Sequence, residues 1–460
     1  MSQLEEFLSS IESVIWGVPL LVLIAAVGIF LTCLLRGVQF RYFLRAFKFL
    51  GTKESEAKGD ISPLQSLMTA MASAVGTGSI VGVSTAICLG GIGAVFWMWV
   101  MGFLGMAVKY GESLLAVKFR ITDKRGEMSG GPMYYIERGL GWKWLALFYA
   151  GAAAIATIGT GNLVQVKAIA DSVHSVLHVD QLVTGCVVAL ITGVVLLRGI
   201  KNIGFVSTVL VPIMAAFYIL AGCAVLIAFR QHVPAAIGMI FSCAFTGQAA
   251  VGGFAGATVL AAIQFGISRS ILSSEAGVGI SSIAAAAART TSSSRQALLS
   301  MTASILSTSI ICTITALVIA VTGSLGKVDE TGTLLNGASL AITAFSSAFY
   351  GGEYIVMTGL ALFAYTTIIG WAYYGEKCCE YLFGERSVVP YRILYTLVLV
   401  PGAIFALNAV WSFSNITNAL MVIPNMIALF GLAKVILKET DEFIATEGKK
   451  PVLDGAAYPS

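Results

Sequence analysis

Residues 73–82, with the sequence SAVGTGSIVG, place three glycines, a threonine and two serines inside an otherwise apolar stretch. Glycine costs a helix interior about 1 kcal/mol relative to alanine, so this composition predicts that a helix is interrupted here. In a membrane, the interruption leaves backbone amides and carbonyls that need other partners. Such amides attract a carboxylate, and such carbonyls attract a small cation. The stretch therefore predicts a binding site for a zwitterion together with an ion.

A second stretch, SCAFTGQ at 242–248, echoes SAVGTGS at 73–79 and also lies inside an apolar run. The two stretches are predicted to cross the membrane in opposite directions, which indicates an inverted repeat with two broken helices. One glycine-rich segment alone is equally compatible with close packing of helices through small residues. Because two related segments occur, we favour a binding site over packing alone.

Composition places these stretches in a membrane protein. Of the 460 residues, 57% are hydrophobic and 11% are charged, whereas soluble domains carry about 25% charged residues. The apolar runs are continuous rather than alternating, which excludes a β-barrel, and no basic, aromatic-rich patch indicates nucleic acid. The eight cysteines lack CxxC spacing and are expected to be reduced. The acidic N-terminus, MSQLEEFLSSIE, differs from the basic start of a cleaved signal, so the first apolar run is expected to be retained.

Apolar runs of about 20 residues predict about eleven membrane-spanning helices. They lie near 13–36, 64–89, 94–118, 143–171, 181–198, 204–229, 235–266, 296–323, 354–376, 390–409 and 413–437. An outside helix or re-entrant segment is expected at 335–350. Lysine and arginine accumulate in alternate loops, so the positive-inside rule predicts an N-terminus outside and a C-terminus in the cytoplasm.

The predicted architecture is an all-α polytopic membrane protein with a five-plus-five inverted repeat and two broken helices. Its parts are an extracytoplasmic N-terminus at 1–12, one extra helix at 13–36, the first repeat at 64–229, the second repeat at 235–437 and a cytoplasmic tail at 438–460.

Five motifs resemble those of the alanine or glycine:cation symporter family. They are the run from GTGSIVG to AVKFR at 76–120, SGGPMYYIERGLG at 129–141, GTGNLVQ at 159–165, SSEAGVGISSIAAAAART at 273–290 and IIGWAYYGEKCCEYLFG at 368–384. The likeness covers nearly the whole chain in the same order. It implies a fold of the leucine-transporter (LeuT) type, in the APC superfamily. It also implies sodium-coupled uptake of alanine or glycine, in some members including the D-isomer.

The resemblance also implies positions for the ligands. The substrate carboxylate would bind at Gly76, Thr77, Gly78 and Ser79, and Gln165 would accept a hydrogen bond from the ammonium group. The side-chain pocket would be walled by Phe254, Trp371 and Ile169. By analogy of fold, the sodium ion would lie between the carbonyls of Ala74 and Val75 and the hydroxyls of Thr366 and Thr367.

The chain departs from the family pattern at positions that bear on the ion. Ser79 stands where an amide is usual, and Ser307 and Thr308 stand where an aspartate–threonine pair is usual. Lys167 replaces a common asparagine and is spaced to pair with Asp171 on one helix face. One interpretation places both at the outer end of their helix, with the lysine reaching toward water. The other is that the lysine substitutes for a bound cation and makes transport sodium-independent or proton-linked.

Other ionisable residues within the apolar runs are functional candidates. Lys109 and Glu112 lie near the cytoplasmic end of the third predicted span, where a structural or gating ion pair is expected. Glu275 follows the seventh predicted span. It could pair with Arg269 or Arg289 as a cytoplasmic gate, or cap a helix.

The predicted function is a secondary transporter of the inner membrane that imports a small neutral amino acid with sodium. The alternatives are a proton-coupled or sodium-independent permease of the same fold and a membrane sensor that binds the amino acid. No nucleophile–base arrangement suggests an enzyme, and His174 and His178 lack a third metal ligand. The expected partners are the substrate, the coupling ion and the lipid bilayer. We expect no other cofactor and a functional monomer.

Overall fold

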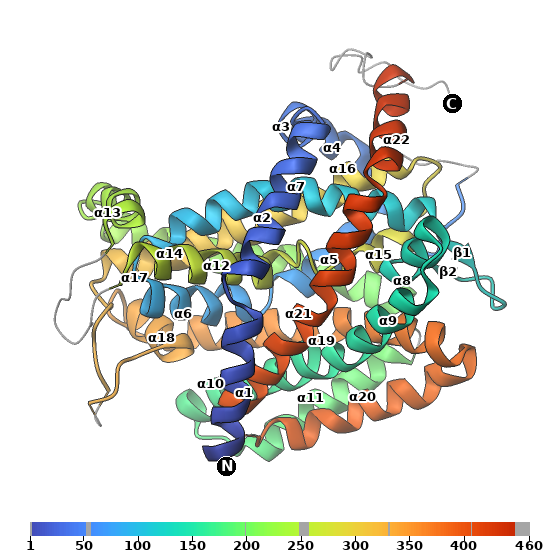
Figure 1. Cartoon of the computed structure of the whole chain (residues 1–460). Coiled ribbons are helices and arrows are strands. Elements are labelled where there is room, and N and C mark those ends of the chain that lie inside the picture. The colour runs from blue at the N-terminus through green and yellow to red at the C-terminus, as the bar shows by residue number, and fades with distance from the viewer. Residues whose placement is uncertain are drawn as a thin grey trace, which may run out of the picture.

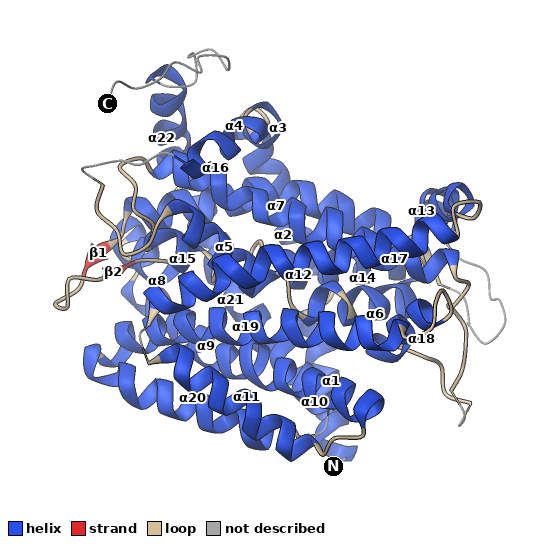
Figure 2. Ribbon diagram, turned by 180° about the vertical axis from the view of Figure 1, so that it is seen from behind, coloured by secondary structure: helices blue, strands red, loops and turns tan. Residues whose placement is uncertain are grey.

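The computed structural model describes residues 2–51, 57–197, 199–247, 257–329, 332–405 and 407–446. These ranges form a bundle of helices with one short β-hairpin at its edge (Figures 1 and 2). The hairpin pairs β1 (Ile121–Thr122) with β2 (Met128–Ser129). We call the end of the bundle that carries this hairpin the hairpin end, and the opposite end, which carries α13 and α18, the α18 end.

The helices of the first half are α1 (Ser2–Ile15), α2 (Val18–Leu34), α3 (Val38–Arg41), α4 (Phe43–Ala46), α5 (Pro63–Ala74), α6 (Val81–Gly90), α7 (Ala94–Lys118), α8 (Pro132–Tyr135), α9 (Lys143–Ile158), α10 (Val164–Leu177), α11 (Gln181–Leu196) and α12 (Ile200–Ala228). Those of the second half are α13 (Val233–Thr246), α14 (Val259–Ser274), α15 (Ser282–Ala286), α16 (Ser293–Ser304), α17 (Cys312–Val321), α18 (Gly337–Ser346), α19 (Gly352–Phe383), α20 (Val388–Gly402), α21 (Leu407–Gly431) and α22 (Ala433–Thr446). Short 3-10 segments are Phe47–Gly51, Thr77–Ser79 and Glu385–Ser387, and π-helical segments are Ile136–Leu140, Gly159–Leu163 and Ile305–Ile311.

The first predicted interruption is confirmed. α5 begins with a capping box, in which the Ser62 hydroxyl and the Gln65 side chain each accept a hydrogen bond from the other residue's backbone amide. The helix ends at Ala74, a 3-10 turn follows, and α6 starts at Val81. We call residues 75–80 the first break.

The second interruption lies elsewhere than predicted. α14 ends at Ser274, Glu275 has a left-handed backbone with φ 56°, and α15 begins only at Ser282. We call residues 275–281 the second break. Gly277 and Gly279 have φ values of 97° and 82°, which glycine adopts without the Cβ penalty of other residues.

The segment 242–248 is therefore not the partner of the first break, and that prediction was wrong. α13 is continuous to Thr246 and ends at Gly247. It packs on the first turns of α7, where Trp97 Nε1 donates to the Ala244 carbonyl at 3.1 Å. In Figures 1 and 2, α13 lies at the α18 end of the bundle. Residues 248–256, which include Phe254, lie outside the described ranges.

The two broken helices run in opposite directions and pack against each other along both halves. Near the α18 end, a Cβ on Gly90 of α6 would lie 3.0 Å from the Ala261 carbonyl of α14. Near the hairpin end, the Ser66 hydroxyl of α5 donates to the Ala284 carbonyl of α15 at 2.9 Å. The two breaks therefore meet near the middle of the bundle.

Within the described ranges, six helical stretches are long and apolar enough to cross a membrane. They are Ala94–Lys118, Lys143–Leu177, Ile200–Ala228, Ser293–Val321, Gly352–Phe383 and Val410–Gly431. Most of the other predicted spans contain shorter or broken helices. The first, at 13–36, is divided between α1 and α2 at Trp16–Gly17. α18 covers the helix expected at 335–350.

Candidate functional site

A small cavity of about 30 Å³ lies where the two breaks meet. It is lined by Ser73, Ala74, Gly76, Thr77 and Gly78 around the first break, Thr160, Val164 and Gln165 at the start of α10, Leu272 and Glu275 around the second break, Thr367 and Trp371 of α19, and Trp411 and Ser414 of α21. Eight of these fourteen residues are predicted site residues. The cavity thus collects side chains from both halves of the sequence at one point in the bundle.

Backbone of the first break faces side chains of α10 and α19. The Thr77 amide donates to Gln165 Oε1 at 3.3 Å. A Cβ on Gly76 would lie 2.4 Å from Thr367 Oγ1 and 3.3 Å from Gln165 Oε1. A side chain at position 76 would therefore force Thr367 to move, and glycine lets the backbone approach both side chains.

A π-helical turn at Gly159–Leu163 orients Gln165. Such turns displace backbone groups from the regular helical pattern and are frequent at functional sites. The Thr160 carbonyl accepts a hydrogen bond from Gln165 Nε2 at 3.0 Å. At Gly161, a Cβ would lie 2.2 Å from the Cβ of Trp371. The glycine therefore allows the tryptophan to pack directly on this turn.

Thr367 contacts the last turn of α5. Its hydroxyl lies 3.1 Å from the Ala72 carbonyl and 3.4 Å from the Ser73 carbonyl. The carbonyls that it faces thus precede Ala74 and Val75, the two predicted. The Thr366 hydroxyl lies 3.4 Å from Met214 Sδ and 3.0 Å from the Phe363 carbonyl, so it points toward α12 and is absent from the residues lining the cavity.

Glu275 contributes a carboxylate to the cavity from the second break. Its Oε2 accepts a hydrogen bond from Ser73 Oγ at 2.9 Å, and Ser73 Oγ shares a second bond of 3.0 Å with the Tyr374 hydroxyl. Oε1 has no hydrogen-bond partner within the described ranges. The structure pairs Glu275 with neither Arg269 nor Arg289 among the described residues; the Arg269 guanidinium instead lies 5.7 Å from the Trp411 ring centroid.

Behind the second break, α7 supplies two buried charges. Lys109 Nζ donates to the Ser274 carbonyl at 2.6 Å, which satisfies the C-terminal end of α14. Glu112 Oε1 accepts hydrogen bonds from the Gly277 amide at 2.9 Å and from Asn425 Nδ2 at 2.7 Å. Lys109 and Glu112 thus hold the second break in place, and the expected ion pair between them is absent from the salt bridges of the described residues.

Three further predicted residues lie outside the cavity lining. Ser79 is buried, and its carbonyl accepts a hydrogen bond from Thr315 Oγ1 at 2.9 Å. Ile169 is buried in the core. Val75 is buried in the first break, between the lining residues Ala74 and Gly76.

Lys167 and Asp171 form the predicted i,i+4 ion pair, with Nζ and Oδ1 2.8 Å apart. Gln181 at the start of α11 contacts both partners, since its Oε1 lies 3.4 Å from the ammonium and its Nε2 donates to Asp171. Neither charged residue lines the cavity. His174 Nδ1 lies 3.0 Å from the Val179 carbonyl, and the described ranges hold no group of three metal-ligating side chains.

Sequence reasoning did not select six lining residues: Ser73, Thr160, Val164, Leu272, Trp411 and Ser414. Ser73 belongs to the glycine-rich segment SAVGTGS, Thr160 and Val164 belong to GTGNLVQ, and Leu272 directly precedes the motif SSEAG. These four therefore had a local signal. Trp411 and Ser414 had none, because only the packing of α21 brings them to the cavity. There, Ser414 Oγ lies 2.5 Å from Thr160 Oγ1.

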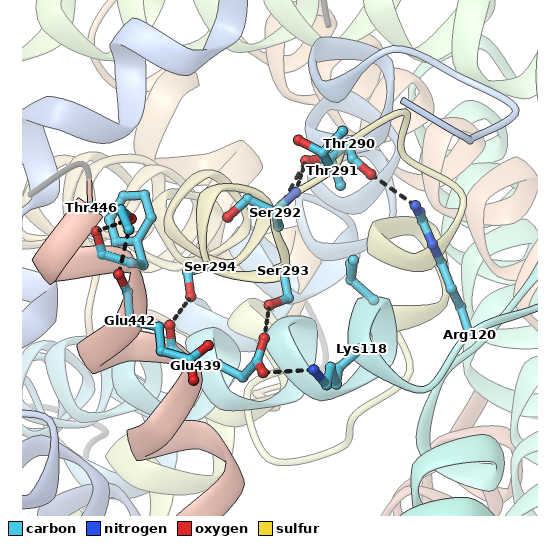
Figure 3. A pocket seen from close by; sticks show the side chains of 12 residues that line it. Lys118, Arg120, Thr290, Thr291, Ser292, Ser293, Ser294, Glu439, Glu442 and Thr446 are labelled. Atoms are coloured by element: carbon cyan, nitrogen blue, oxygen red, sulfur yellow. Dashed lines mark hydrogen bonds and ion pairs between the residues drawn. The ribbon is translucent and has the colours of Figure 1, made fainter. Parts of the chain in front are cut away.

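A second cavity, of about 490 Å³, lies at the hairpin end between α7, α16 and α22 (Figure 3). Its charged groups have partners within the protein: Glu439 pairs with Lys118 at 2.7 Å and accepts a hydrogen bond from the Ser293 hydroxyl at 3.0 Å. Arg120 donates to the Thr290 carbonyl at 2.9 Å. This cavity therefore connects α22 to the bundle, and its side chains do not converge on a common point.

Arg120 also closes the hairpin end around the broken helices. Its guanidinium donates to the carbonyls of Ala286 and Ala288, which follow the second break, at 2.9 and 2.7 Å. Next to it, Asp60 Oδ2 accepts a hydrogen bond from the Met128 amide. Burial raises the pKa of the Asp60 carboxyl above its ordinary value.

Comparison with known proteins matches the chain to one family of transporters along nearly its whole length. Residues 1–454 match the sodium:alanine symporter family. The sodium/alanine symporter AgcS of Methanococcus maripaludis is 46% identical over 441 residues, which are 95% of this chain and 96% of that protein. The amino-acid carrier protein AlsT of Bacillus subtilis is 31% identical over 99% of this chain and 97% of its own length.

Among solved structures, MhsT in complex with L-phenylalanine aligns with a TM-score of 0.61 and 14% identity. The alignment covers 84% of this chain and 93% of MhsT. A Na+-coupled sialic acid symporter aligns with a TM-score of 0.52 and 12% identity, over 95% and 92% of the two chains. At such identities the likeness concerns the fold alone, and it confirms the LeuT-type fold.

Proposed function

Since the chain belongs to the sodium:alanine symporter family, we propose that it imports alanine or glycine together with sodium. It is a secondary transporter of the membrane, not an enzyme. The observation that carries the proposal is the meeting of two broken helices at one small cavity. The backbone amides of the first break and the Gln165 side chain there offer partners to both ends of an amino acid.

The first break is proposed to bind the substrate carboxylate, through the amides of Gly76, Thr77, Gly78 and Ser79. Gln165 Oε1 already accepts a hydrogen bond from the Thr77 amide, so this oxygen occupies the position of a substrate oxygen. If a carboxylate oxygen of the substrate replaced Gln165 Oε1 at the Thr77 amide, Oε1 would be released to accept a hydrogen bond from the substrate's ammonium group. Gln165 is therefore proposed to change partners when the substrate binds.

The sodium ion is proposed to bind beside Thr367, which faces the carbonyls of Ala72 and Ser73. Hydroxyl and carbonyl oxygens suit a hard cation. The originally predicted ligands Ala74, Val75 and Thr366 stay proposals. A cation here would join α5 to α19, so ion binding and the position of the first break would be coupled.

The size of the cavity favours a small substrate. Trp371 and Leu272 line it, and Trp371 is fixed by its contact with Gly161. A cavity of about 30 Å³ is comparable to the volume of one water molecule, so side chains must move apart to admit even alanine or glycine, and larger substrates would require larger movements. Phe254 and Ile169 remain proposed walls of the pocket.

The membrane arrangement is proposed from the charges of the loops. The basic loops carrying Arg120 and Arg125 belong to the hairpin end, which the positive-inside rule assigns to the cytoplasm. The proposal includes eleven spans, an outside N-terminus and a cytoplasmic C-terminus in the inner membrane. Alternating access would follow from movement of the paired broken helices against the surrounding helices.

Proton coupling through Lys167 is the competing proposal. The ammonium group binds Asp171 and Gln181 and is absent from the cavity lining. A substitute for a bound cation would have to contact the cavity or the first break. The geometry therefore favours sodium, with Lys167 as a structural residue of α10.

The test is uptake of labelled alanine and glycine into proteoliposomes under an inward sodium gradient, an inward proton gradient or no gradient. We expect concentrative uptake with sodium only. Thr367→Ala should raise the sodium concentration for half-maximal uptake by at least about 10-fold, the cost of about 1.4 kcal/mol. Thr358→Ala, an exposed threonine on the same helix, is the matched control. Uptake driven by protons alone would reject sodium coupling.

A further inference from the structure

The cavity contains a carboxylate whose role the proposed binding mode leaves open. Among the described lining residues, Glu275 alone carries a charge. It is 2% exposed, and its Oε1 is buried without a hydrogen-bond partner in the described ranges. A buried carboxylate oxygen without a partner loses its hydration energy and gains nothing in return. Such an oxygen in a ligand cavity is suited to a donor that arrives with the ligand.

The orientation of this carboxylate is fixed by the protein. Ser73 Oγ donates to Oε2 and is itself in contact with the Tyr374 hydroxyl. The residue also has a left-handed backbone, which ends α14 and turns the chain into the second break. Glu275 is therefore held on one oxygen by the first broken helix, while Oε1 lies in the cavity beside the Trp371 indole N–H, which has no other partner in the described ranges.

With both carboxylates ionised, the buried charges around the second break are balanced by one further positive charge, carried by a cation or by a proton. Lys109, Glu112 and Glu275 are each no more than 2% exposed, and with both carboxylates ionised their formal charges sum to −1. Lys109 is the only cation among the described groups that influences either carboxylate, and its ammonium is bound to the Ser274 carbonyl. An unbalanced buried charge is costly unless it is paired.

Gln165 cannot supply a positive charge, because its side chain is neutral and both its Oε1 and its Nε2 already have hydrogen-bond partners. Oε1 accepts a hydrogen bond from the Thr77 amide, and Nε2 donates to the Thr160 carbonyl. The remaining side chains that line the cavity with Glu275 are uncharged as well. The balancing charge therefore comes either from a cationic group of a bound ligand or from a proton on one of the two carboxylates.

We propose that Glu275 Oε1 binds the ammonium group of the substrate and makes the transporter specific for α-amino acids. This inference rests on the proposed function, since it assigns the second end of the same substrate. The substrate carboxylate lies at the amides of the first break and its ammonium lies at the carboxylate of the second. One zwitterion then links the two broken helices, and its positive charge balances the buried cluster.

The test compares alanine with lactate, which carries a hydroxyl in place of the ammonium group. Equilibrium binding of both ligands is measured on the purified transporter in sodium, for the wild type and for Glu275→Gln. A hydrogen bond to a charged group is worth a factor of about 10 to 100 in affinity. We expect alanine affinity to fall by that factor, while lactate affinity stays the same or rises because the buried negative charge is gone. The preference for alanine over lactate should therefore collapse.

Two further variants make the result decisive. Glu275→Asp keeps the charge but retracts it by one methylene, so alanine should bind more weakly and still be preferred over lactate. Glu112→Gln removes a buried carboxylate that is absent from the cavity lining, so it should lower the preference for alanine over lactate much less than Glu275→Gln does. If Glu275→Gln keeps the full preference for alanine, or weakens both ligands in parallel, Glu275 does not bind the ammonium.

Sodium dependence separates the remaining outcomes. If Glu275 were a sodium ligand, Glu275→Gln would raise the sodium requirement and leave the ratio of alanine to lactate affinity unchanged, which overturns the inference. If the wild type bound neither alanine nor glycine, the proposed function itself would fail, independently of any variant. Normal alanine binding by the wild type with an unchanged ligand preference in Glu275→Gln would refute this inference alone.

Discussion

The two breaks meet at one cavity but satisfy their exposed backbone by different chemistry. The first break uses neutral partners: the Thr77 amide binds Gln165, and the preceding carbonyls face the Thr367 hydroxyl. At the second break, the Ser274 carbonyl binds Lys109 and the Gly277 amide binds Glu112. An inverted pair of helices thus has the symmetry of its backbone without the symmetry of its side chains.

Because of this difference, we distinguish the first break, which faces the ligand, from the second break, whose conformation is fixed by the buried charges of α7. Neutral partners are exchanged at small cost, so the first break can bind a carboxylate and a cation and release them again. Buried charges are costly to separate once paired, so the second break is held in one conformation against α7. We infer that the first break adapts to the ligand, while the second presents the fixed carboxylate of Glu275.

The largest effect is expected from removing the cation of the second break. Lys109→Met leaves Glu112 and Glu275 buried without their described cation, which costs about 3–5 kcal/mol of unfolding free energy. The measurement is reversible or thermal unfolding of the purified protein in detergent. Lys118→Met is the matched control, because this lysine on the same helix pairs with Glu439 at a partly exposed position and should cost less than about 1 kcal/mol. Equal losses in the two variants would contradict a scaffolding role for the buried charges.

The next largest effect is expected from adding a methyl group at Gly76 in the first break. Gly76→Ala places a methyl group 2.4 Å from Thr367 Oγ1, although φ at this residue is −119° and suits any amino acid. We expect folding to be retained and alanine affinity to fall by about 100-fold, which corresponds to about 2.7 kcal/mol. Equilibrium binding of labelled alanine provides the measurement.

Gly82→Ala is the control for this variant. Position 82 lies on α6 beyond the break, and the nearest atom to a new Cβ there is Arg269 Cδ at 3.9 Å. This substitution should leave alanine affinity within about 2-fold of the wild type, since 3.9 Å is an ordinary contact distance. Comparable losses at positions 76 and 82 would show that α6 as a whole, rather than the close approach at Gly76, limits binding.

The contrast between the breaks also explains what the sequence could predict. The first break is visible because SAVGTGS interrupts a long apolar run, so composition alone locates it. The pair of Lys167 and Asp171 is equally local, since i,i+4 spacing places two side chains on one face of a helix. Both predictions depend on a few consecutive residues and were confirmed.

The second break was misplaced for a physical reason. Its hairpin-end half, α15, has only five residues, Ser282–Ala286, and is built from small side chains, so it lacks the length of an apolar span. The apolar run at 235–266 instead joined α13 to α14, and a chance echo within α13 suggested the break there. Because the second break was placed elsewhere, the contacts of Lys109 and Glu112 with it could not be predicted either. The contributions of Trp411 and Ser414 depend on the packing of α21, which no local pattern encodes.

The smallest effect is expected at Gly277 and tests whether the second break is limited by conformation rather than space. A Cβ at this position would lie 3.4 Å from Met426 Cε, an ordinary contact, but φ is 97°. Gly277→Ala should therefore lower the unfolding free energy by about 1–2 kcal/mol through backbone strain, measured by unfolding in detergent, and leave alanine affinity nearly unchanged. Gly238→Ala, in α13 with no atom near the new Cβ, should not destabilise the protein. If Gly277→Ala instead abolished alanine binding at unchanged stability, the second break would itself adapt to the ligand, and the distinction between the two breaks would be wrong.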